Sequence, residues 1–275
     1  MCRLFSVKAR NKSKVHHSLV AAENALMEQS RKHPDGWGIA YYQQGVPHLI
    51  KCSDPAYKSE MFHHVSHALF SDTVIAHVRK ATFGSISIAN CHPFQQGRWV
   101  MAHNGEIPNF KKIRGDLMAA ISPQFLVNIL GATDSEIYCA LIMQELYQLR
   151  VLDSPAPAVQ LVARAVRAAV KKIEFLAGRY DIEKKTSLNI VLSNGTLLLA
   201  YRHGRELNYS CFRDDESSCT GALLANKCVP NYIEGCSISH LLISSEPVAQ
   251  KDLWQSLLDR QIVAVDHEWK FYRDL

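Results

Sequence analysis

Apolar and polar positions along the chain form two groups of short strand-like runs that flank a central block with helical spacing. These runs predict strands at 2–7, 37–42, 73–78, 99–102, 188–192, 196–201, 241–244, 262–265 and 269–272. A segment rich in helix-favouring Ala, Glu, Leu, Met and Gln predicts a helix over 18–32. Strands grouped at both ends around central helices favour sheets covered by helices over a regularly alternating parallel fold.

The central block predicts two helices. The first begins at Thr133-Asp134-Ser135-Glu136, which has the spacing of a capping box and precedes apolar residues at helical intervals. The second is amphipathic, with an apolar side of Val162, Val166, Ala169, Ile173 and Leu176 and a polar side of Arg164, Arg167, Lys171 and Glu174. For that polar side we favour a solvated helix face over a phosphate-binding stripe.

The dipeptide Asn194-Gly195 lies between two apolar runs and is the strongest hairpin signal in the chain. Asn-Gly supplies the two positive φ angles of a type I′ turn. The sequence therefore predicts a type I′ turn between the strands at 188–192 and 196–201.

Composition and charge narrow the class of protein. Of the 275 residues, 47% are hydrophobic and 21% are charged, which disfavours disorder, a fibrous repeat and a coiled coil. The net charge of +5 is too small and too dispersed to indicate nucleic-acid binding, and no apolar run reaches membrane-spanning length. Because 153–157 is the only linker-like stretch, we expect a single domain over 2–275.

The cysteines indicate a reducing compartment. Eight are present and none forms a CxxC pair, which favours reduced thiols over a disulfide scaffold. The chain turns polar by residue eight and lacks the apolar stretch of a signal peptide, so we expect a cytoplasmic, unanchored protein. The late cysteines Cys211, Cys219, Cys228 and Cys236 are separated by gaps of seven or eight residues. Structural zinc sites use closely spaced pairs of cysteines, so no metal is expected.

The residue best suited to covalent chemistry is Cys2. Removal of Met1 would leave a thiol and a free α-amine on the same residue. That amine has an ordinary pKa of about 7.7–8.0, so near neutral pH it can take the thiol proton without a separate base. Taken alone, however, a cysteine at position two is more typical of a small apolar residue in a first strand.

Five further segments change that interpretation. In chain order they are 33–38 (HPDGWG), 77–82 (HVRKAT), 90–94 (NCHPF), 101–106 (MAHNGE) and 133–136 (TDSE). Together with Cys2 they resemble the class II glutamine amidotransferases, which belong to the N-terminal-nucleophile hydrolases. Segment 33–38 looks like the motif of the small, single-domain branch that includes γ-glutamyl hydrolases of thiol metabolism. The resemblance implies an α+β fold, a four-layer αββα sandwich of two mainly antiparallel sheets with helices outside.

The resemblance also implies a role for each motif residue. Cys2 would attack the γ-amide carbonyl of glutamine, while the Asn104 side chain and the Gly105 N–H would form the oxyanion hole. Arg79 would clamp the substrate α-carboxylate, a task that its planar fork suits better than lysine. Asp134 would receive the α-ammonium.

Further along the motifs, Thr82 and the backbone around Lys80 would line the amino-acid pocket. These residues also have ordinary structural explanations. An acid such as Asp134 suits the first turn of a helix, and Thr82 suits a half-buried strand end. His92 and His103 are expected to be structural, because the mechanism needs no imidazole base.

The expected function is hydrolysis of the γ-amide of glutamine or of another γ-glutamyl compound through a thioester on Cys2, with no cofactor. The expected partner is this small-molecule substrate, with no nucleic acid and no membrane. One alternative is a glutaminase subunit that works with a separate synthetase or peptidase subunit. Another is a non-catalytic γ-glutamyl-binding regulatory module, if Met1 is retained, because a blocked nitrogen cannot act as a base.

The sequence departs from larger class II enzymes in ways that bear on the substrate. Arg3 follows the cysteine where glycine is common, and Lys80 stands where tryptophan is frequent after the clamp arginine. The chain after residue 150 shows no Walker loop, GxGxxG fingerprint or recognisable synthetase module that could consume ammonia. An internal ammonia channel to a second active site is therefore not expected.

Overall fold

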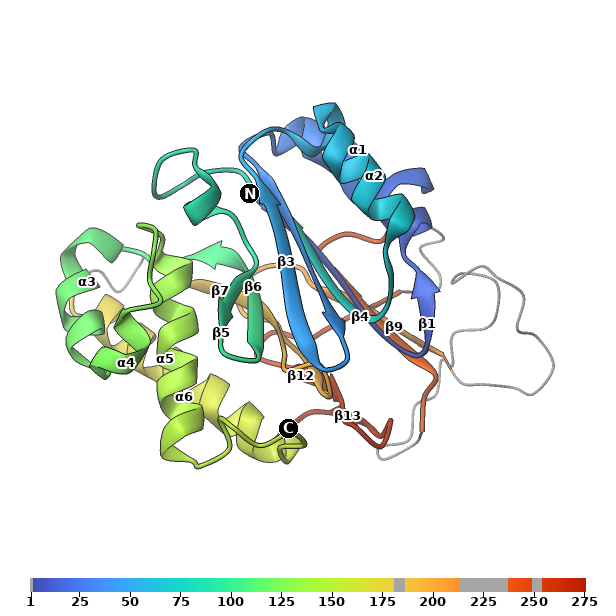
Figure 1. Cartoon of the computed structure of the whole chain (residues 1–275). Coiled ribbons are helices and arrows are strands. Elements are labelled where there is room, and N and C mark those ends of the chain that lie inside the picture. The colour runs from blue at the N-terminus through green and yellow to red at the C-terminus, as the bar shows by residue number, and fades with distance from the viewer. Residues whose placement is uncertain (1, 181–185, 213–236, 249–253) are drawn as a thin grey trace.

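Two antiparallel sheets lie face to face in the computed structural model, which describes residues 2–180, 186–212, 237–248 and 254–275 (Figure 1). One sheet has the order β11-β9-β10-β1-β4-β2-β3, with β1 Arg3–Lys14, β2 Trp37–Gln43, β3 Val46–Cys52, β4 Phe70–Val78, β9 Asn208–Phe212, β10 His240–Ser244 and β11 Gln255–Ser256. The other has the order β13-β12-β8-β7-β6-β5, with β5 Phe94–Gln96, β6 Trp99–Glu106, β7 Ser187–Ser193, β8 Leu198–Tyr201, β12 Ile262–Val265 and β13 Phe271–Arg273.

Helices cover the outer side of each sheet (Figure 1). On the seven-stranded sheet lie η1 His17–Ala21, α1 Leu26–Gln29, η2 Ser30–Lys32, η3 Ala56–Lys58 and α2 Glu60–Ala68. On the six-stranded sheet lie α3 Phe110–Ala119, α4 Pro123–Leu126, α5 Asp134–Gln148 and α6 Val159–Gly178, and η4 Ile88–Asn90 precedes β5. The four-layer αββα sandwich is confirmed.

Alternation along the strands fills three separate hydrophobic cores. In β1, Leu4 belongs to the core between the sheets and Phe5 to the core under α1 and α2. In β6, Val100 and Ala102 join the core between the sheets, whereas Met101 packs under α5 and α6. Successive side chains of a strand point to opposite faces, so this pattern buries both faces of each sheet. Each fully buried large side chain in these cores contributes about 1.5–3 kcal/mol.

The capping box predicted at the start of α5 is confirmed. The Thr133 hydroxyl oxygen accepts the Glu136 N–H at 3.3 Å, and the Glu136 carboxylate accepts the Thr133 N–H at 3.5 Å. This reciprocal pair satisfies two backbone groups at the helix N-terminus that no residue of the helix itself can bond.

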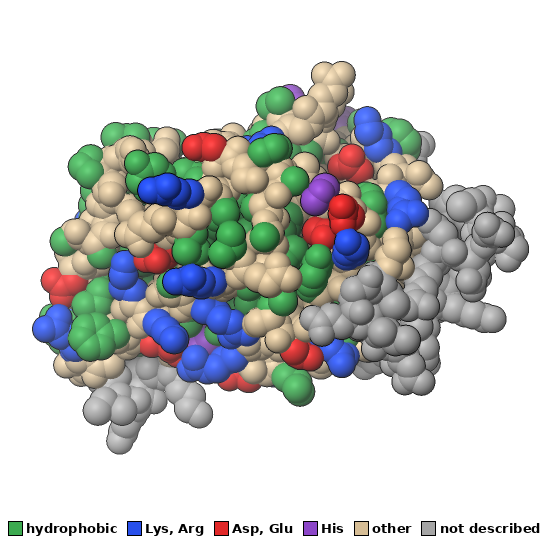
Figure 2. Space-filling view, turned by 90° about the horizontal axis from the view of Figure 1, so that it is seen from below, with side chains coloured by type: hydrophobic (Ala, Val, Ile, Leu, Met, Phe, Trp, Pro, Cys, Tyr) green, Lys and Arg blue, Asp and Glu red, His purple; other side chains and the backbone are tan. Residues whose placement is uncertain are grey.

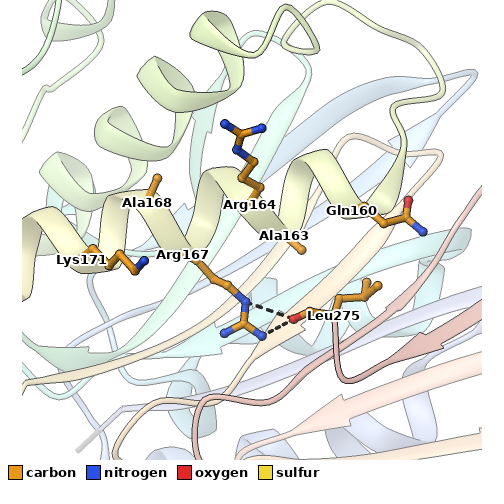
Figure 3. Close-up of a pocket in the computed structure, with 7 residues that line it drawn as sticks. All are labelled: Gln160, Ala163, Arg164, Arg167, Ala168, Lys171 and Leu275. Carbon is orange, nitrogen blue, oxygen red and sulfur yellow. Dashed lines mark hydrogen bonds between the residues drawn. The ribbon is translucent and has the colours of Figure 1, made fainter.

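The polar side of α6 does not converge on one point. Arg167 donates from Nε to the Leu275 carbonyl oxygen at 3.0 Å, whereas Arg164 points to the other side of the helix axis (Figure 3). On the face shown in Figure 2, basic side chains are interspersed with acidic ones. This arrangement favours the solvated face over a phosphate clamp. No helix within the described ranges is both long enough and apolar enough to cross a membrane.

The single helix predicted over 18–32 is wrong. The segment contains the π-helical turn η1, the short helix α1 and the 3-10 turn η2. Between η1 and α1, Ala22 has extended backbone angles, with ψ 154°. Asn24 donates from its side chain to the Pro247 carbonyl at 2.9 Å and from its backbone to the Val248 carbonyl at 3.3 Å. These contacts with the chain after β10 take the place of helical hydrogen bonds.

The β7–β8 hairpin forms as predicted, but its turn is not type I′. The loop runs over 194–197, and only Gly195, with φ 92°, has a positive φ there. The Asn194 side-chain oxygen instead accepts the N–H groups of Thr196 at 3.1 Å and Leu197 at 2.9 Å. A side chain that bonds the backbone two and three residues ahead closes the turn without a left-handed asparagine.

Removing the α5 cap gives a stability prediction. We expect Thr133→Ala to lower the free energy of unfolding by about 0.5–2 kcal/mol, because the Glu136 N–H loses its acceptor. Thr133→Ser keeps the hydroxyl and should retain most of the stability. Urea unfolding followed by circular dichroism measures both variants. An alanine variant as stable as the unmodified chain would contradict the capping role.

Candidate functional site

Cys2 lies directly before β1, at the end of the sheet where β4 runs into the loop that precedes β5 (Figure 1). Its half-buried thiol contacts the Lys80 backbone: the Lys80 N–H donates to Sγ at 3.3 Å, and Sγ donates to the Lys80 carbonyl at 3.4 Å. Arg3, in register with Val78 of β4, donates to the Cys2 carbonyl at 3.1 Å. The pairing of β1 with β4 therefore fixes the position of the thiol.

The surroundings of the thiol act on its pKa in both directions. Burial raises the pKa of the Cys2 thiol above its ordinary value. The hydrogen bond with Lys80 opposes this rise, and so do the positive charges of Arg79 and Arg205. Because burial is the largest of these effects, the thiol needs a neighbouring base before it can act as a thiolate at neutral pH.

Asp35 and Gly36 hold the backbone on both sides of Lys80. The Asp35 carboxylate accepts the Ala81 N–H at 2.8 Å, and the Asp35 N–H donates to the Arg79 carbonyl at 3.0 Å. The Arg79 N–H in turn donates to the Gly36 carbonyl at 2.8 Å. Gly36 has φ 116°, and a Cβ there would lie 2.8 Å from a backbone carbonyl oxygen, so the position requires glycine.

The guanidinium of Arg79 faces the loop that follows it. Arg79 is only 3% exposed, and it donates from Nη1 to the Ser85 carbonyl at 3.0 Å and from Nη2 to the Phe83 carbonyl at 2.8 Å. Asn90 also donates to the Ser85 carbonyl, at 2.9 Å. In the same loop, Thr82 is exposed, and its side chain has no hydrogen bond to any described residue. A substrate carboxylate would have to share the Arg79 guanidinium with these loop carbonyls or displace them from it.

Two side chains fix the amide of Asn104 near the end of β6. Asn104 Nδ2 donates to Ser245 Oγ at 3.0 Å, and Asn104 Oδ1 accepts from Arg205 Nη1 at 3.4 Å. The Ser245 hydroxyl oxygen also accepts the Leu4 N–H at 3.1 Å. One hydroxyl therefore joins the strand that follows the thiol to β6 in the opposite sheet. An amide nitrogen carries two hydrogens, so Asn104 retains a second donor.

Gly105 allows β6 to pack closely on β7. A Cβ at this position would lie 1.7 Å from the Ser187 carbonyl oxygen and 2.4 Å from His103 Nε2. The Ser187 contact is with backbone of the paired strand, so no side chain fits without moving β7 away. The residue after Asn104 must therefore be glycine for the strand pair to form as it does.

Asp134 begins α5 beside the end of β6. It is 4% exposed; its Oδ2 accepts the Ile107 N–H at 2.9 Å, and its Oδ1 accepts from Ser135 Oγ at 3.2 Å. A carboxylate has about four acceptor positions, so two remain for a ligand ammonium. A negative charge in the first turn also stabilises the helix, and this structural role is compatible with binding a ligand ammonium.

Ser245 and Arg205 are site residues that the sequence analysis did not identify. Arg205 lies in the loop between β8 and β9, where the Asn189 side chain donates to the carbonyls of Arg205 and Glu206, both at 3.1 Å. Asn189 is the register partner of Asn104 across β7 and β6. Ser245 and Arg205 are 141 and 101 residues from Asn104 in sequence, so no local motif marks them. For Ser245, the one available signal was its position directly after the predicted strand at 241–244.

No group of three His, Cys, Asp or Glu that could hold a metal ion occurs in the part of the chain that the structure describes. Cys2, Cys52, Cys91 and Cys139 are free thiols, and Cys211 lies in β9. The remaining late cysteines of the sequence analysis, Cys219, Cys228 and Cys236, lie outside the described residues.

Three buried histidines meet where β4, β6 and the chain before β5 come together. The ring centroid of His92 lies 4.2 Å from that of His77 and 6.3 Å from that of His103. Burial lowers the pKa of His77 to about 3 and also lowers the pKa values of His92 and His103. His103 Nδ1 lies 2.8 Å from Ser135 Oγ, which in turn donates to Asp134. A neutral His103 therefore helps to position the acid at the start of α5.

The lowered pKa of His77 makes stability depend on pH. Between its ordinary value of 6.5 and about 3, the unfolded chain binds a proton at this histidine and the folded chain does not. The stabilisation is therefore complete above pH 6.5 and is lost as the pH falls, by up to about 1.4 kcal/mol per pH unit for one group. We expect His77→Gln to flatten the slope of unfolding free energy between pH 6 and 4, measured by urea unfolding. An unchanged slope would contradict this assignment.

Comparison with known proteins identifies the family of the chain. Residues 1–265 match the family model described as glutamine amidotransferases class-II. The chain is 34% identical over 166 residues to the probable glutamine amidotransferase DUG3 of Saccharomyces cerevisiae, an alignment that covers 54% of this chain and 46% of that protein. It is 27% identical over 176 residues to the gamma-glutamyl-hercynylcysteine sulfoxide hydrolase of Mycolicibacterium smegmatis, with 63% of each chain covered.

The fold is shared with solved structures. A glutamine aminotransferase class-II domain protein from Silicibacter pomeroyi has a TM-score of 0.64 at 20% identity, with 99% of this chain and 98% of that chain covered. The chain spans about half the length of curated relatives that it matches, 46% of DUG3 and 54% of a Methanocaldococcus jannaschii protein. Since the family model extends from residue 1 to residue 265, the chain belongs to the class II glutamine amidotransferases.

Proposed function

We propose that the mature chain hydrolyses the γ-amide of glutamine or of another γ-glutamyl compound, with Cys2 as the nucleophile once Met1 is removed. The observation that carries this proposal is the Ser245 hydroxyl, which bonds both the Leu4 N–H and the Asn104 amide. It holds the strand that begins at the thiol against an amide donor, as acyl transfer requires. The name of the Mycolicibacterium smegmatis relative supports a γ-glutamyl substrate.

The proposed reaction has two stages. The α-amine of Cys2 takes the thiol proton, and the thiolate attacks the γ-carbonyl carbon, which forms a C–S bond and an oxyanion. The Asn104 amide and the Gly105 N–H stabilise that oxyanion. The protonated α-amine then gives its proton to the leaving amine as the C–N bond breaks. Water attacks the thioester, the C–S bond breaks, and the γ-carboxylic acid and the thiol are released.

Substrate recognition uses opposite charges at the two ends of the amino-acid part. Asp134 accepts the α-ammonium, since its carboxylate has two acceptor positions left after Ile107 and Ser135 are bonded. Arg79 attracts the α-carboxylate from its position under the loop, and Thr82, exposed on that loop, lines the pocket. All of these groups come from one chain, so the proposed hydrolysis needs no partner subunit.

A reducing compartment such as the cytoplasm suits this chemistry. A nucleophilic thiol must stay reduced to react, and a disulfide would remove it. The free thiols of Cys2, Cys52, Cys91 and Cys139 are compatible with such a compartment.

A diazo ketone analogue of glutamine tests the nucleophile. We expect the reagent to alkylate Cys2 and abolish hydrolysis, with the label found by mass spectrometry on the N-terminal peptide. Cys2→Ala should lower kcat/KM by about 10³-fold or more and should not be labelled. Cys52→Ala is the matched control, because this thiol is partly exposed and outside the site, and it should behave as the unmodified chain. Label on another residue, or full activity of Cys2→Ala, would contradict the proposal.

Arg205 is expected to act as a positioning residue for Asn104. Arg205→Gln should lower kcat by about tenfold with little change in KM, because the oxyanion amide loses one of its two supports. The same variant should shift the pH profile of Cys2 alkylation by iodoacetamide to higher pH, since the Arg205 charge lowers the pKa of that thiol. Arg205→Lys should recover part of both effects. A rise in KM alone would instead indicate a direct contact with the substrate.

A further inference from the structure

A cavity of about 420 Å³ lies away from the nucleophile, between β3, the β5–β6 hairpin and the start of α5. Its apolar lining includes Leu49, Ile88, Phe94 and Leu130, and its charged groups are Lys51 and Glu136. None of the residues proposed above for catalysis or substrate binding lines it. Cavities that hold small ligands have volumes of about 300–1,000 Å³ and combine an apolar lining with a few polar groups. This cavity matches both features.

Lys51 is held in the cavity by packing, without an ion pair or a hydrogen bond to any described residue. It is the register partner of Gly38, where an added Cβ would lie 3.2 Å from Lys51 Cγ, so its stem packs closely on β2. The ammonium lies 4.8 Å from the centre of the Phe94 ring. Within the described ranges, no carboxylate forms an ion pair with it and no acceptor forms a hydrogen bond. Burial lowers the pKa of Lys51 to about 8, and the negative charge of Glu136 opposes this fall without cancelling it.

The acidic group in the same wall is already satisfied. Glu136 Oε1 accepts the N–H groups of Leu130 at 3.0 Å and Gly131 at 2.9 Å, and Glu136 Oε2 accepts the Thr133 hydroxyl at 3.2 Å. The Glu136 oxygens are therefore bonded to the start of α5, and the carboxylate acts on Lys51 only through its charge. Lys51 keeps its hydrogen-bond donors for a ligand, which favours an anionic group beside it.

A second cavity, on α6, also has basic lining residues, but its Arg167 is already bonded to the chain. It has a volume of about 380 Å³ and is lined by Arg164, Arg167 and Lys171. There, Arg167 already donates to the Leu275 carbonyl at 3.0 Å (Figure 3). It also donates to the Arg260 carbonyl at 3.2 Å. The donors of Arg167 are therefore already bonded to backbone carbonyls, whereas those of Lys51 are not.

We propose that the cavity at Lys51 is a second ligand site, which takes a small monocarboxylate with an apolar or aromatic body. The carboxylate pairs with the Lys51 ammonium, and the apolar body fills the space between Leu49, Ile88 and Leu130. A ligand carboxylate adds to the partial stabilisation that the Phe94 ring and the Glu136 charge give the buried ammonium. The site is independent of the Cys2 chemistry, because it shares none of its residues.

Isothermal titration calorimetry with 4-phenylbutyrate and its neutral counterpart 4-phenylbutanamide tests this site. We expect the acid to bind about tenfold or more tightly than the amide, because only the acid makes a charge-assisted hydrogen bond. Lys51→Gln should lose that difference, and Lys51→Arg should keep it. Lys58→Gln is the control, since Lys58 is exposed and lies 5.5 Å from the Tyr57 ring outside the cavity.

Trace acetylation with acetic anhydride locates the ligand in the same samples. Saturating 4-phenylbutyrate should protect Lys51 from acetylation and leave Lys58 unchanged, as read by mass spectrometry. Equal affinity for acid and amide, unchanged binding by Lys51→Gln, or no binding of the acid at millimolar concentration would each overturn the proposal. Thermal unfolding of Lys51→Gln, expected near that of the unmodified chain, shows that a loss of binding is not a loss of fold.

Discussion

The candidate site depends on one buried hydroxyl oxygen that accepts a hydrogen bond from each of the two sheets. Ser245 follows β10, and its Oγ accepts the Leu4 N–H at 3.1 Å and the Asn104 Nδ2 at 3.0 Å, while its own N–H donates to the Leu4 carbonyl at 3.0 Å. A serine oxygen has two lone pairs, so this contact uses its full accepting capacity. An unsatisfied buried donor costs about 1–3 kcal/mol, so the two sheets resist sliding at this point. The thiol and the amide donor keep their relative positions for that reason.

Burial explains why the proposed nucleophile would depend on the removal of Met1. Cys2 is held by hydrogen bonds with the Lys80 backbone, and its burial there raises the pKa of the thiol, which makes the thiol a poor nucleophile by itself. The buried His77, His92 and His103 have lowered pKa values, and His103 is engaged with Ser135, so none of them is assigned as the base. The terminal nitrogen is the base that the mechanism assigns to the thiol, and an amide nitrogen cannot take that role.

The sequence predicted those features that arise from neighbouring residues. Thr133 and Glu136 are three positions apart, so their capping box could be read directly, and the strands that line the cores follow a period of two. The helix over 18–32 failed because Asn24 bonds the chain after β10, a contact between distant segments. The turn at Asn194 failed because its side chain, rather than a left-handed backbone, closes the loop.

The same distinction separates the site residues. Cys2, Asn104 and Asp134 stand in short motifs, and the family they indicate was confirmed. Ser245 and Arg205 reach Asn104 only through the register of β1 with β10 and of β6 with β7. Lys51 could not be recognised either, since its place in the cavity depends on how β3, the β5–β6 hairpin and α5 pack together. Such pairings are set by the assembled sheets, and no local spacing encodes them.

The central claim is that the free α-amine of Cys2 is the base that activates its own thiol. It is tested most directly by comparing two forms of the same chain, one with Met1 removed and one with Met1 retained, each verified by intact mass. Release of the amine product from a γ-glutamyl amide is measured for both. We predict turnover for the form that begins at Cys2 and none above background for the form that keeps Met1. Equal turnover of the two forms would contradict the account.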